Sequence, residues 1–325
     1  MNQRLKVIVV MLATGCCFYL YGYGEKAAGS IQKDAGGTNL TGTSLADISA
    51  EGLGNPKELE KIKDAMPAKA TVTPKQPRKL LVFNLCKGFV HSSIPYCAKA
   101  LEVMGKKTGA FEVVCSKDMS IFKPENLNQF DAVCFNNTTE LDFNEPELQK
   151  SLMDFVKGGK GIIGIHAATD NFYTWPQAAE MLGGQFDGHP WTRSGTWAFK
   201  IEDPCHPINA AFGGKDFKLS DEIYRIKPFN LRKNCRVLVR LDMTDKVNLT
   251  GAKGLRPTDK DVPISWVRSC GKGRVFYCSF GHNHDLFWNP AVLQHYLDGI
   301  QFALGDLAVD TTPGGEQPSL EVKKE

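Results

Sequence analysis

Short apolar runs that alternate with amphipathic segments constrain the fold of this chain more than any other feature. The expected buried strands are apolar runs of a few residues, over 79–85, 111–115, 131–135 and 161–165. The expected helices carry apolar residues at helical spacing, over 93–104, 145–156 and 175–182. Strands that alternate with helices predict a parallel, doubly wound sheet of the α/β class.

The pattern changes after Gly195. Strand-like runs at 196–201, 236–241, 264–267 and 274–280 have no long helices between them, and Gly271-Lys272-Gly273 suits a hairpin turn between the last two. The C-terminal half therefore adds an antiparallel β region to the mostly parallel sheet. A final amphipathic helix is predicted over 290–304.

Length and composition favour one large globular domain. The chain has 325 residues, of which 42% are hydrophobic and 23% charged, with a formal net charge of +3. No Lys/Arg run suggests a nucleic-acid partner. We expect a linker with a short helix over 25–78, a compact domain over 79–306 and a disordered tail over 307–325.

The first 24 residues resemble a targeting segment. Arg4 and Lys6 precede an apolar run that reaches Tyr21, which is the layout of a secretory signal peptide. Residues 13–16 (ATGC) also resemble a bacterial lipoprotein box that would acylate Cys16, and an uncleaved anchor is the third interpretation. All three place the mature chain outside the cytoplasm, with any membrane attachment made through the N-terminus.

Eight cysteines lie beyond this segment, and none forms a CxxC pair or a zinc-finger spacing. Several end apolar strand-like runs, where cysteine usually serves as a small buried hydrophobe. We expect mostly free core thiols, with a Cys270–Cys278 bridge as the alternative.

Histidines gather where strands end. Ligands of open α/β sheets bind beyond the carboxyl ends of the strands. Five of the seven histidines stand in polar loops at or near such ends, and four of them are candidate catalytic residues: His91, His166, His189 and His282. We prefer His282 to His284, because the turning loop should direct only one of them into the cleft. Asp221 and Glu222 are candidate carboxylate partners.

Two chemistries fit such a cluster. His91, His189 and His282 could hold a divalent metal such as zinc. Alternatively, the histidines transfer protons at a sugar or carbonyl carbon without a metal. Polar and aromatic residues around these loops are candidate substrate contacts: Asn136, Asn137, Asp170, Tyr173 and Trp191.

Over residues 79–305 the chain resembles the ThuA-like, or trehalose utilisation, family. The motifs that carry the resemblance are GFVHS at 88–92, GIIGIHAA at 161–168, GGQFDGHP at 183–190, HPI at 206–208, DEIY at 221–224, PISW at 263–266 and GKGRVFY at 271–277 leading into Gly281-His282. The resemblance implies a flavodoxin-like fold related to class I glutamine amidotransferases. Those enzymes carry a nucleophilic Cys at the turn where this chain has His166, so amidotransferase activity is not expected.

The resemblance also implies carbohydrate catabolism, alongside an oxidoreductase that makes keto-sugars. Our leading hypothesis is an exported enzyme of hydrolase, lyase or isomerase type that acts on a disaccharide or keto-sugar by histidine-assisted proton transfer. The alternative is a non-catalytic glycan-binding or scaffold protein at the cell surface.

Overall fold

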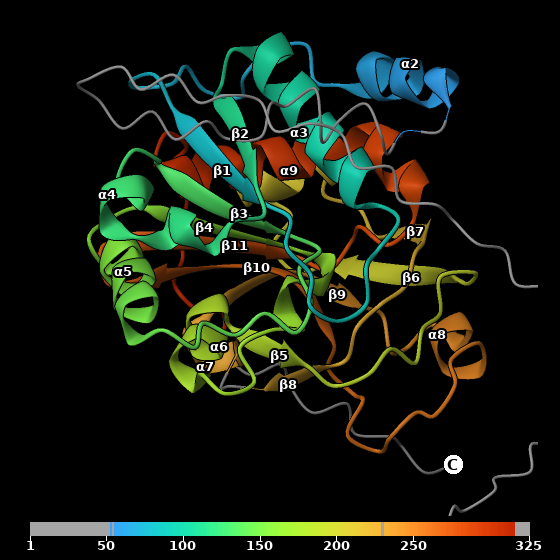
Figure 1. Cartoon of the computed structure of the whole chain (residues 1–325). Helices are drawn as coiled ribbons and strands as arrows, with labels where there is room; N and C mark the ends of the chain where they lie inside the picture. The colour runs from blue at the N-terminus through green and yellow to red at the C-terminus, as the bar shows by residue number, and fades with distance from the viewer. Residues whose placement is uncertain (1–52, 54, 229–230, 316–325) are drawn as a thin grey trace, which may run out of the picture. The chain divides into compact units, whose positions relative to one another are not determined.

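The computed structural model describes residue 53, residues 55–228 and residues 231–315 (Figure 1). The expected targeting segment over residues 1–24 lies outside these ranges. Among the described residues, no helix combines the length and the apolar character needed to cross a membrane.

A nine-stranded mixed sheet organises the domain, in the order β2-β1-β3-β4-β11-β10-β9-β6-β7. Its strands are β1 (Lys79–Phe83), β2 (Glu112–Ser116), β3 (Ala132–Asn136), β4 (Gly161–Ile165), β6 (Thr196–Ile201), β7 (Phe217–Ser220), β9 (Arg236–Leu241), β10 (Pro263–Cys270) and β11 (Gly273–Cys278). The first five strands of this order pair in parallel. The remaining pairs are antiparallel, as predicted for the C-terminal half.

Helices cover both faces of the parallel half. The main helices are α2 (Pro56–Ala65), α3 (Ile94–Thr108), α5 (Pro146–Lys157), α6 (Pro176–Leu182) and α9 (Pro290–Leu304), with shorter ones at α4 (Pro124–Leu127), α7 (Leu231–Asn234) and α8 (Lys246–Thr250). Short 3-10 turns are η1 (Met119–Phe122), η2 (His166–Thr169), η3 (Pro207–Phe212) and η4 (His284–Trp288).

The alternation of side chains along β1 explains why helices cover both faces of the sheet. Leu80 and Val82 pack into the core shared with α3 and α9, whereas Leu81 and Phe83 pack into the core shared with α5 and α6. Successive side chains of a strand point to opposite faces, so an all-apolar strand must be covered on both sides. The doubly wound arrangement follows from this pattern.

Three strands were not predicted from the sequence. They are β7 and a separate two-stranded antiparallel sheet made of β5 (Gly184–Phe186) and β8 (Ile226–Pro228). Runs of three or four residues carry too little periodicity to be recognised. The β5–β8 pair matters for function, because it places two site residues beside each other.

Part of the expected linker packs against the domain. The side chains of Ile62 and Met66 are buried in the same core as α3 and α9. Further along, the Thr71 hydroxyl hydrogen-bonds the Asp298 carboxylate, and Arg78 pairs with Asp306. The folded unit therefore begins before residue 79, at least from α2 onward.

Two further expectations require correction. The β10–β11 register sets Cys270 opposite Gly273 and Cys278 opposite Ser265, at different ends of the hairpin, and all eight described cysteines are free thiols. The alternative of a Cys270–Cys278 bridge was therefore wrong. In the predicted tail, Asp310 pairs with Arg236, so this part of the tail is held against the domain, while residues 316–325 lie outside the described ranges.

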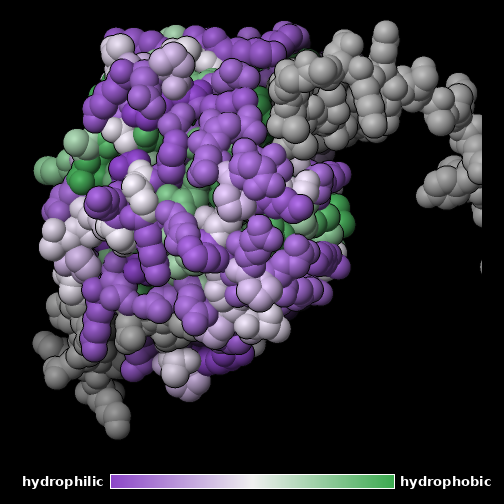
Figure 2. All heavy atoms as spheres, turned by 60° about the vertical axis from the view of Figure 1, so that its left-hand side comes forward, coloured by the Kyte–Doolittle hydropathy of each residue, from purple (hydrophilic) through white to green (hydrophobic). Residues whose placement is uncertain are grey.

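On the face drawn in Figure 2, hydrophilic residues predominate and hydrophobic ones form small separate patches. Large exposed apolar side chains are few in the described chain: Phe89, Val90, Tyr173 and Leu249.

Candidate metal centre

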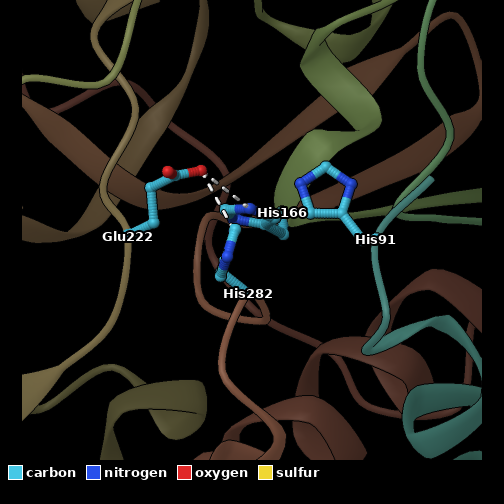
Figure 3. Close-up of side chains that lie close together, drawn as sticks. All are labelled: His91, His166, Glu222 and His282. Atoms are coloured by element: carbon cyan, nitrogen blue, oxygen red, sulfur yellow. Dashed lines mark ion pairs between the residues drawn. The ribbon is translucent and has the colours of Figure 1, made fainter. Parts of the chain in front are cut away.

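Four side chains from four separate segments converge beyond the carboxyl ends of the parallel strands (Figure 3). His91 lies in the loop after β1, His166 directly after β4, and His282 just after β11. Glu222 comes from the segment between β7 and β8. Each residue contributes one ligand atom, and these four atoms lie within 4.8 Å of one another. Sequence-distant loops thus build a compact N₃O donor set.

The backbone after β4 directs His166 into this group. Its φ is +48°, an uncommon left-handed conformation for a non-glycine residue, at the sharp turn into η2. Nδ1 of His166 donates to the carbonyl oxygen of Ser279 at 2.8 Å, and the Tyr277 hydroxyl donates to the His166 carbonyl at 2.7 Å. This bonding orients the ring and leaves Nε2 to face the group.

Gly281 allows the neighbouring loop to approach closely. Its φ is +139°, and a Cβ at this position would lie 3.2 Å from Cβ of His166. A side chain there would push the loop that carries His282 away from the turn that carries His166.

Asp221 is fully buried and holds the His282 loop through backbone hydrogen bonds. Its carboxylate accepts from the amides of Gly281 at 2.8 Å, His282 at 3.1 Å and Asn283 at 2.9 Å. Asp221 thus faces the His282 loop, while Glu222 faces the histidines. Both residues were candidate carboxylate partners from the sequence, and in the structure Glu222 is the one that joins the histidines.

The β5–β8 ladder sets His189 beside Glu222. The backbone pairs Phe186 with Ile226 and continues as an isolated bridge between Trp191 and Ile223. His189 lies within this antiparallel stretch, opposite the segment that bears Glu222. Nδ1 of His189 is 3.3 Å from Oε1 of Glu222.

The two oxygens of Glu222 therefore face different partners. Oε2 lies 3.1 Å from Nδ1 of His282 and 3.7 Å from Nε2 of His166. Oε1 faces His189, whose side chain is 54% exposed, whereas those of Glu222 and His282 are only 12% and 13% exposed. The carboxylate thus connects a buried donor group to a histidine at the surface.

Electrostatics keep the imidazoles of His91 and His166 neutral. Burial, together with the neighbouring His282, lowers the pKa of His91 to about 4. Burial and the other histidines also lower the pKa of His166 well below its ordinary value. Burial alone would raise the pKa of Glu222, but the hydrogen bond and charge of His282 outweigh it and lower this pKa. Neutral imidazoles beside an ionised carboxylate are the protonation states that bind a metal ion.

The polar atoms of the group also fit a cation. Among the described residues, Nδ1 of His91 and Nε2 of His166 are buried without a hydrogen-bond partner. Unpaired buried polar atoms are rare, because leaving one unsatisfied costs about 1–3 kcal/mol. Nitrogen and carboxylate donors in this number suit zinc or a similar divalent ion.

The remaining candidate residues are distributed differently. His189 lies outside the group of four ligand atoms, where we had expected it to be a metal ligand. Asn136 and Asn137 are fully buried and hydrogen-bonded to each other, and Trp191 is fully buried with its indole N–H on the Asn248 carbonyl. Their side chains offer no surface to a substrate, which corrects that expectation. Asp170 is partly exposed, and Tyr173 is exposed and donates its hydroxyl proton to Asp170.

Sequence reasoning missed Tyr224 as a site residue. Its ring lies 4.5 Å from that of His166, and its hydroxyl lies 3.4 Å from Nε2 of His91. Burial raises the pKa of Tyr224 well above its ordinary value, so the hydroxyl stays protonated. Its position two residues after Glu222 on an extended segment was the available signal.

Comparisons with known proteins identify a family and a fold. Residues 79–303 match the family model ThuA, described as trehalose utilisation. A search of curated proteins found no match.

Two solved structures of ThuA-like proteins are similar to this chain. The one from Bacteroides uniformis ATCC 8492 is 19% identical, covers 71% of this chain and 93% of its own, and has a TM-score of 0.57. The one from Parabacteroides merdae ATCC 43184 is 16% identical, covers 75% and 94%, and has a TM-score of 0.55. At these identities the likeness shows the α/β fold.

Proposed function

Because this chain belongs to the ThuA, or trehalose utilisation, family, we propose that it is a metal-dependent enzyme acting on a disaccharide or keto-sugar. The observation that carries the proposal is the convergence of His91, His166, His282 and Glu222. When bound there, a divalent cation would polarise a carbonyl or hydroxyl oxygen of the sugar.

His189 is the group we assign to proton transfer. It is the half-exposed histidine of the site, and its Nδ1 faces Oε1 of Glu222. An Nδ1–H donated to that oxygen leaves Nε2 free to take a proton from the substrate, for example from the carbon next to a sugar carbonyl. The electron pair of the broken C–H bond moves onto the carbonyl oxygen as an enolate, and the same nitrogen returns the proton to carbon in an isomerisation or to the departing alkoxide in a β-elimination. Neither reaction requires an oxidant or reductant. Glu222 stabilises the imidazolium that forms, as a carboxylate does beside a catalytic histidine.

Two parts of the proposal rest on the sequence alone. The pattern of residues 1–24 supports action outside the cytoplasm. A sugar oxidoreductase in the same pathway would supply the keto-sugar, as the family resemblance implies.

Metal content provides the first test. Purified full-length protein should contain about one divalent ion per chain by inductively coupled plasma mass spectrometry. His91→Ala and Glu222→Gln should lose it. His189→Gln is the matched control, since it removes a neighbouring histidine outside the donor group and should retain the ion.

Turnover separates binding from catalysis. Deuterium exchange from solvent into an oxidised disaccharide, followed by NMR, should be lost in His189→Gln although its metal content is normal. Protein that binds no zinc, manganese or nickel after incubation would remove the metal proposal. Saturable glycan binding without turnover would favour the glycan-binding alternative.

A further inference from the structure

We propose that Phe89 and Tyr173, with the carboxylates of Glu140 and Asp170 between them, form a subsite that binds a pyranose ring next to the candidate metal centre. The inference rests on the proposed function and adds the part of the site that recognises the sugar. None of these four residues belongs to the donor group.

The exposure of the loop after β1 first points to a ligand. The side chains of Phe89 and Val90 are 65% and 67% exposed, although large apolar side chains are normally buried in this domain. The Phe89 ring is also 4.8 Å from that of His91, in edge-to-face contact. An exposed aromatic ring therefore lies directly against a residue of the donor group.

This loop is held in place on both sides of its exposed residues. The amides of Lys87 and Gly88 both donate to the carbonyl of Thr139, and the Thr139 hydroxyl donates to the carbonyl of Phe89. Beyond Val90, the Ser92 hydroxyl is 2.8 Å from Nε2 of His284. The apolar side chains are thus presented by a fixed backbone, which lowers the entropy lost on binding.

A chain of contacts connects the Phe89 loop to two carboxylates and, through them, to the Tyr173 ring. A Cβ on Gly88 would lie 2.5 Å from the Glu140 carboxylate, so this side chain lies over the base of the Phe89 loop. The Glu140 amide donates to the Asp170 carbonyl, and Asp170 in turn accepts from the Tyr173 hydroxyl. Glu140 and Asp170 therefore lie on the segments that connect the two rings.

The Tyr173 ring is also near a cation. Its side chain is 43% exposed, and the Lys227 ammonium lies 6.0 Å from its ring centroid. The rim of the site thus offers two aromatic rings, two acceptor groups and one donor group.

This combination fits a pyranose better than a protein surface. A sugar ring has C–H faces that pack on aromatic rings and hydroxyls that donate to carboxylates. A protein partner would require a contiguous apolar area of several hundred Å², whereas here apolar side chains alternate with charged ones.

Binding of small glycosides to the full chain tests the subsite. Methyl α-D-glucopyranoside and trehalose would be titrated and followed by saturation-transfer NMR, with glycerol as a polyol that lacks a ring. We expect saturable binding of the glycosides and none of glycerol. Phe89→Ala and Tyr173→Ala should each weaken binding about two- to tenfold.

Matched variants distinguish stacking from general effects. Phe89→Tyr and Tyr173→Phe retain the rings and should bind within about twofold of wild type. Leu249→Ala removes another exposed apolar side chain, on α8, and should leave binding unchanged. Equal binding by all variants, or no saturable glycoside binding by the wild type, would overturn the subsite.

The chelated protein separates this inference from the proposed function. Because the subsite contains none of the donor residues, glycoside binding should persist after treatment with EDTA, and Phe89→Ala should keep its metal. Binding that requires the metal and ignores both rings would refute the subsite and leave the metal centre standing. Ring-dependent binding by a protein that never takes up metal would support the subsite and refute the metal centre.

Discussion

Substitution of Asp221 offers a quantitative test of how the candidate site is built. This carboxylate is fully buried and accepts three backbone N–H groups from the loop that carries His282. The relevant changes are Asp221→Asn, which keeps the shape but only one acceptor oxygen, and Asp221→Ala, which removes both. Asp154→Asn on the exposed face of α5 is the matched control, since Asp154 is paired only with Lys150 at the surface.

The expected losses follow from the hydrogen bonds. Oδ1 accepts from His282 and Asn283, and Oδ2 accepts from Gly281. In Asp221→Asn the side-chain oxygen can take the place of Oδ1 and still accept from His282 and Asn283. The amide N–H of Gly281 then has no acceptor, which lowers the free energy of unfolding by about 1–3 kcal/mol. In Asp221→Ala all three backbone N–H groups have no acceptor, so the free energy of unfolding should fall by at least about 3 kcal/mol.

Burial of the charge acts in the opposite direction. Burial raises the pKa of Asp221 to about 7, although the backbone hydrogen bonds from Gly281 and Asn283 oppose this rise. A neutral asparagine avoids the unfavourable burial of a charge, so Asp221→Asn should fall at the lower end of its range.

Urea unfolding and zinc titration measure the two consequences. Asp221→Asn should lose about 1 kcal/mol of stability and bind zinc about 10- to 100-fold more weakly, because His282 loses its fixed position. Asp154→Asn should change stability by less than about 1 kcal/mol and leave zinc binding unaltered. Wild-type stability and zinc affinity in Asp221→Asn would refute the idea that Asp221 positions His282.

Three further outcomes concern the rest of the fold. Ile62→Ala should lower the free energy of unfolding by about 2–4 kcal/mol, measured with urea, because Ile62 is fully buried; no change would mean that α2 does not belong to the folded unit. Gly161→Ala should lower the free energy of unfolding by about 2 kcal/mol or more in the same assay, because its Cβ would lie 2.3 Å from the Ala303 carbonyl oxygen. Gly109→Ala should lower it by about 1 kcal/mol, because Gly109 has φ +67° but open space around it. Equal losses in the two variants would contradict this packing argument. Burial lowers the pKa of His295 to about 4, so between about pH 6.5 and pH 4 the unfolded chain takes up a proton that the folded chain does not, and the free energy of unfolding should fall as the pH drops through this range. In urea unfolding at these pH values, the fall should be smaller in His295→Gln by up to about 3 kcal/mol. An unchanged pH profile in this variant would show that His295 is not the source of the fall.

The helices and strands with a strong pattern were predictable from sequence. The expected bounds of β4, β6, β9 and α9 agree with the structure. In α9, Pro290 occupies the first turn, Asn289 caps it and Gly305 ends it in a left-handed conformation, so local signals and packing agree. The segment 55–78 was misjudged because its polar composition concealed single buried residues such as Ile62.

The sequence predicted that histidines gather at one site, but it did not predict every residue of the group. Topology alone brings the loops after β1, β4 and β11 to one edge, so that His91, His166 and His282 could be grouped in advance. The sequence could not show whether Asp221 or Glu222 joins this group, because the answer depends on which way a short, weakly patterned segment turns. The distinction between His166 as part of the donor group and His189 as its neighbour depends on the β5–β8 ladder, which sequence did not reveal.

The turn after β4 connects these observations. The family resemblance implies a relation in fold to class I glutamine amidotransferases, in which a nucleophilic Cys would stand at this position. Here the same sharp turn holds His166 at φ +48°, with its carbonyl fixed by Tyr277 and its ring by Ser279. Backbone strain at a single residue persists only where the surroundings enforce it, and the bonds from Tyr277 and Ser279 do so here. Because the turn fixes where a side chain begins and leaves its chemistry open, a change of residue type can replace a nucleophile by a nitrogen donor. In this chain the turn directs an imidazole nitrogen toward Glu222, in the group that also contains His91 and His282.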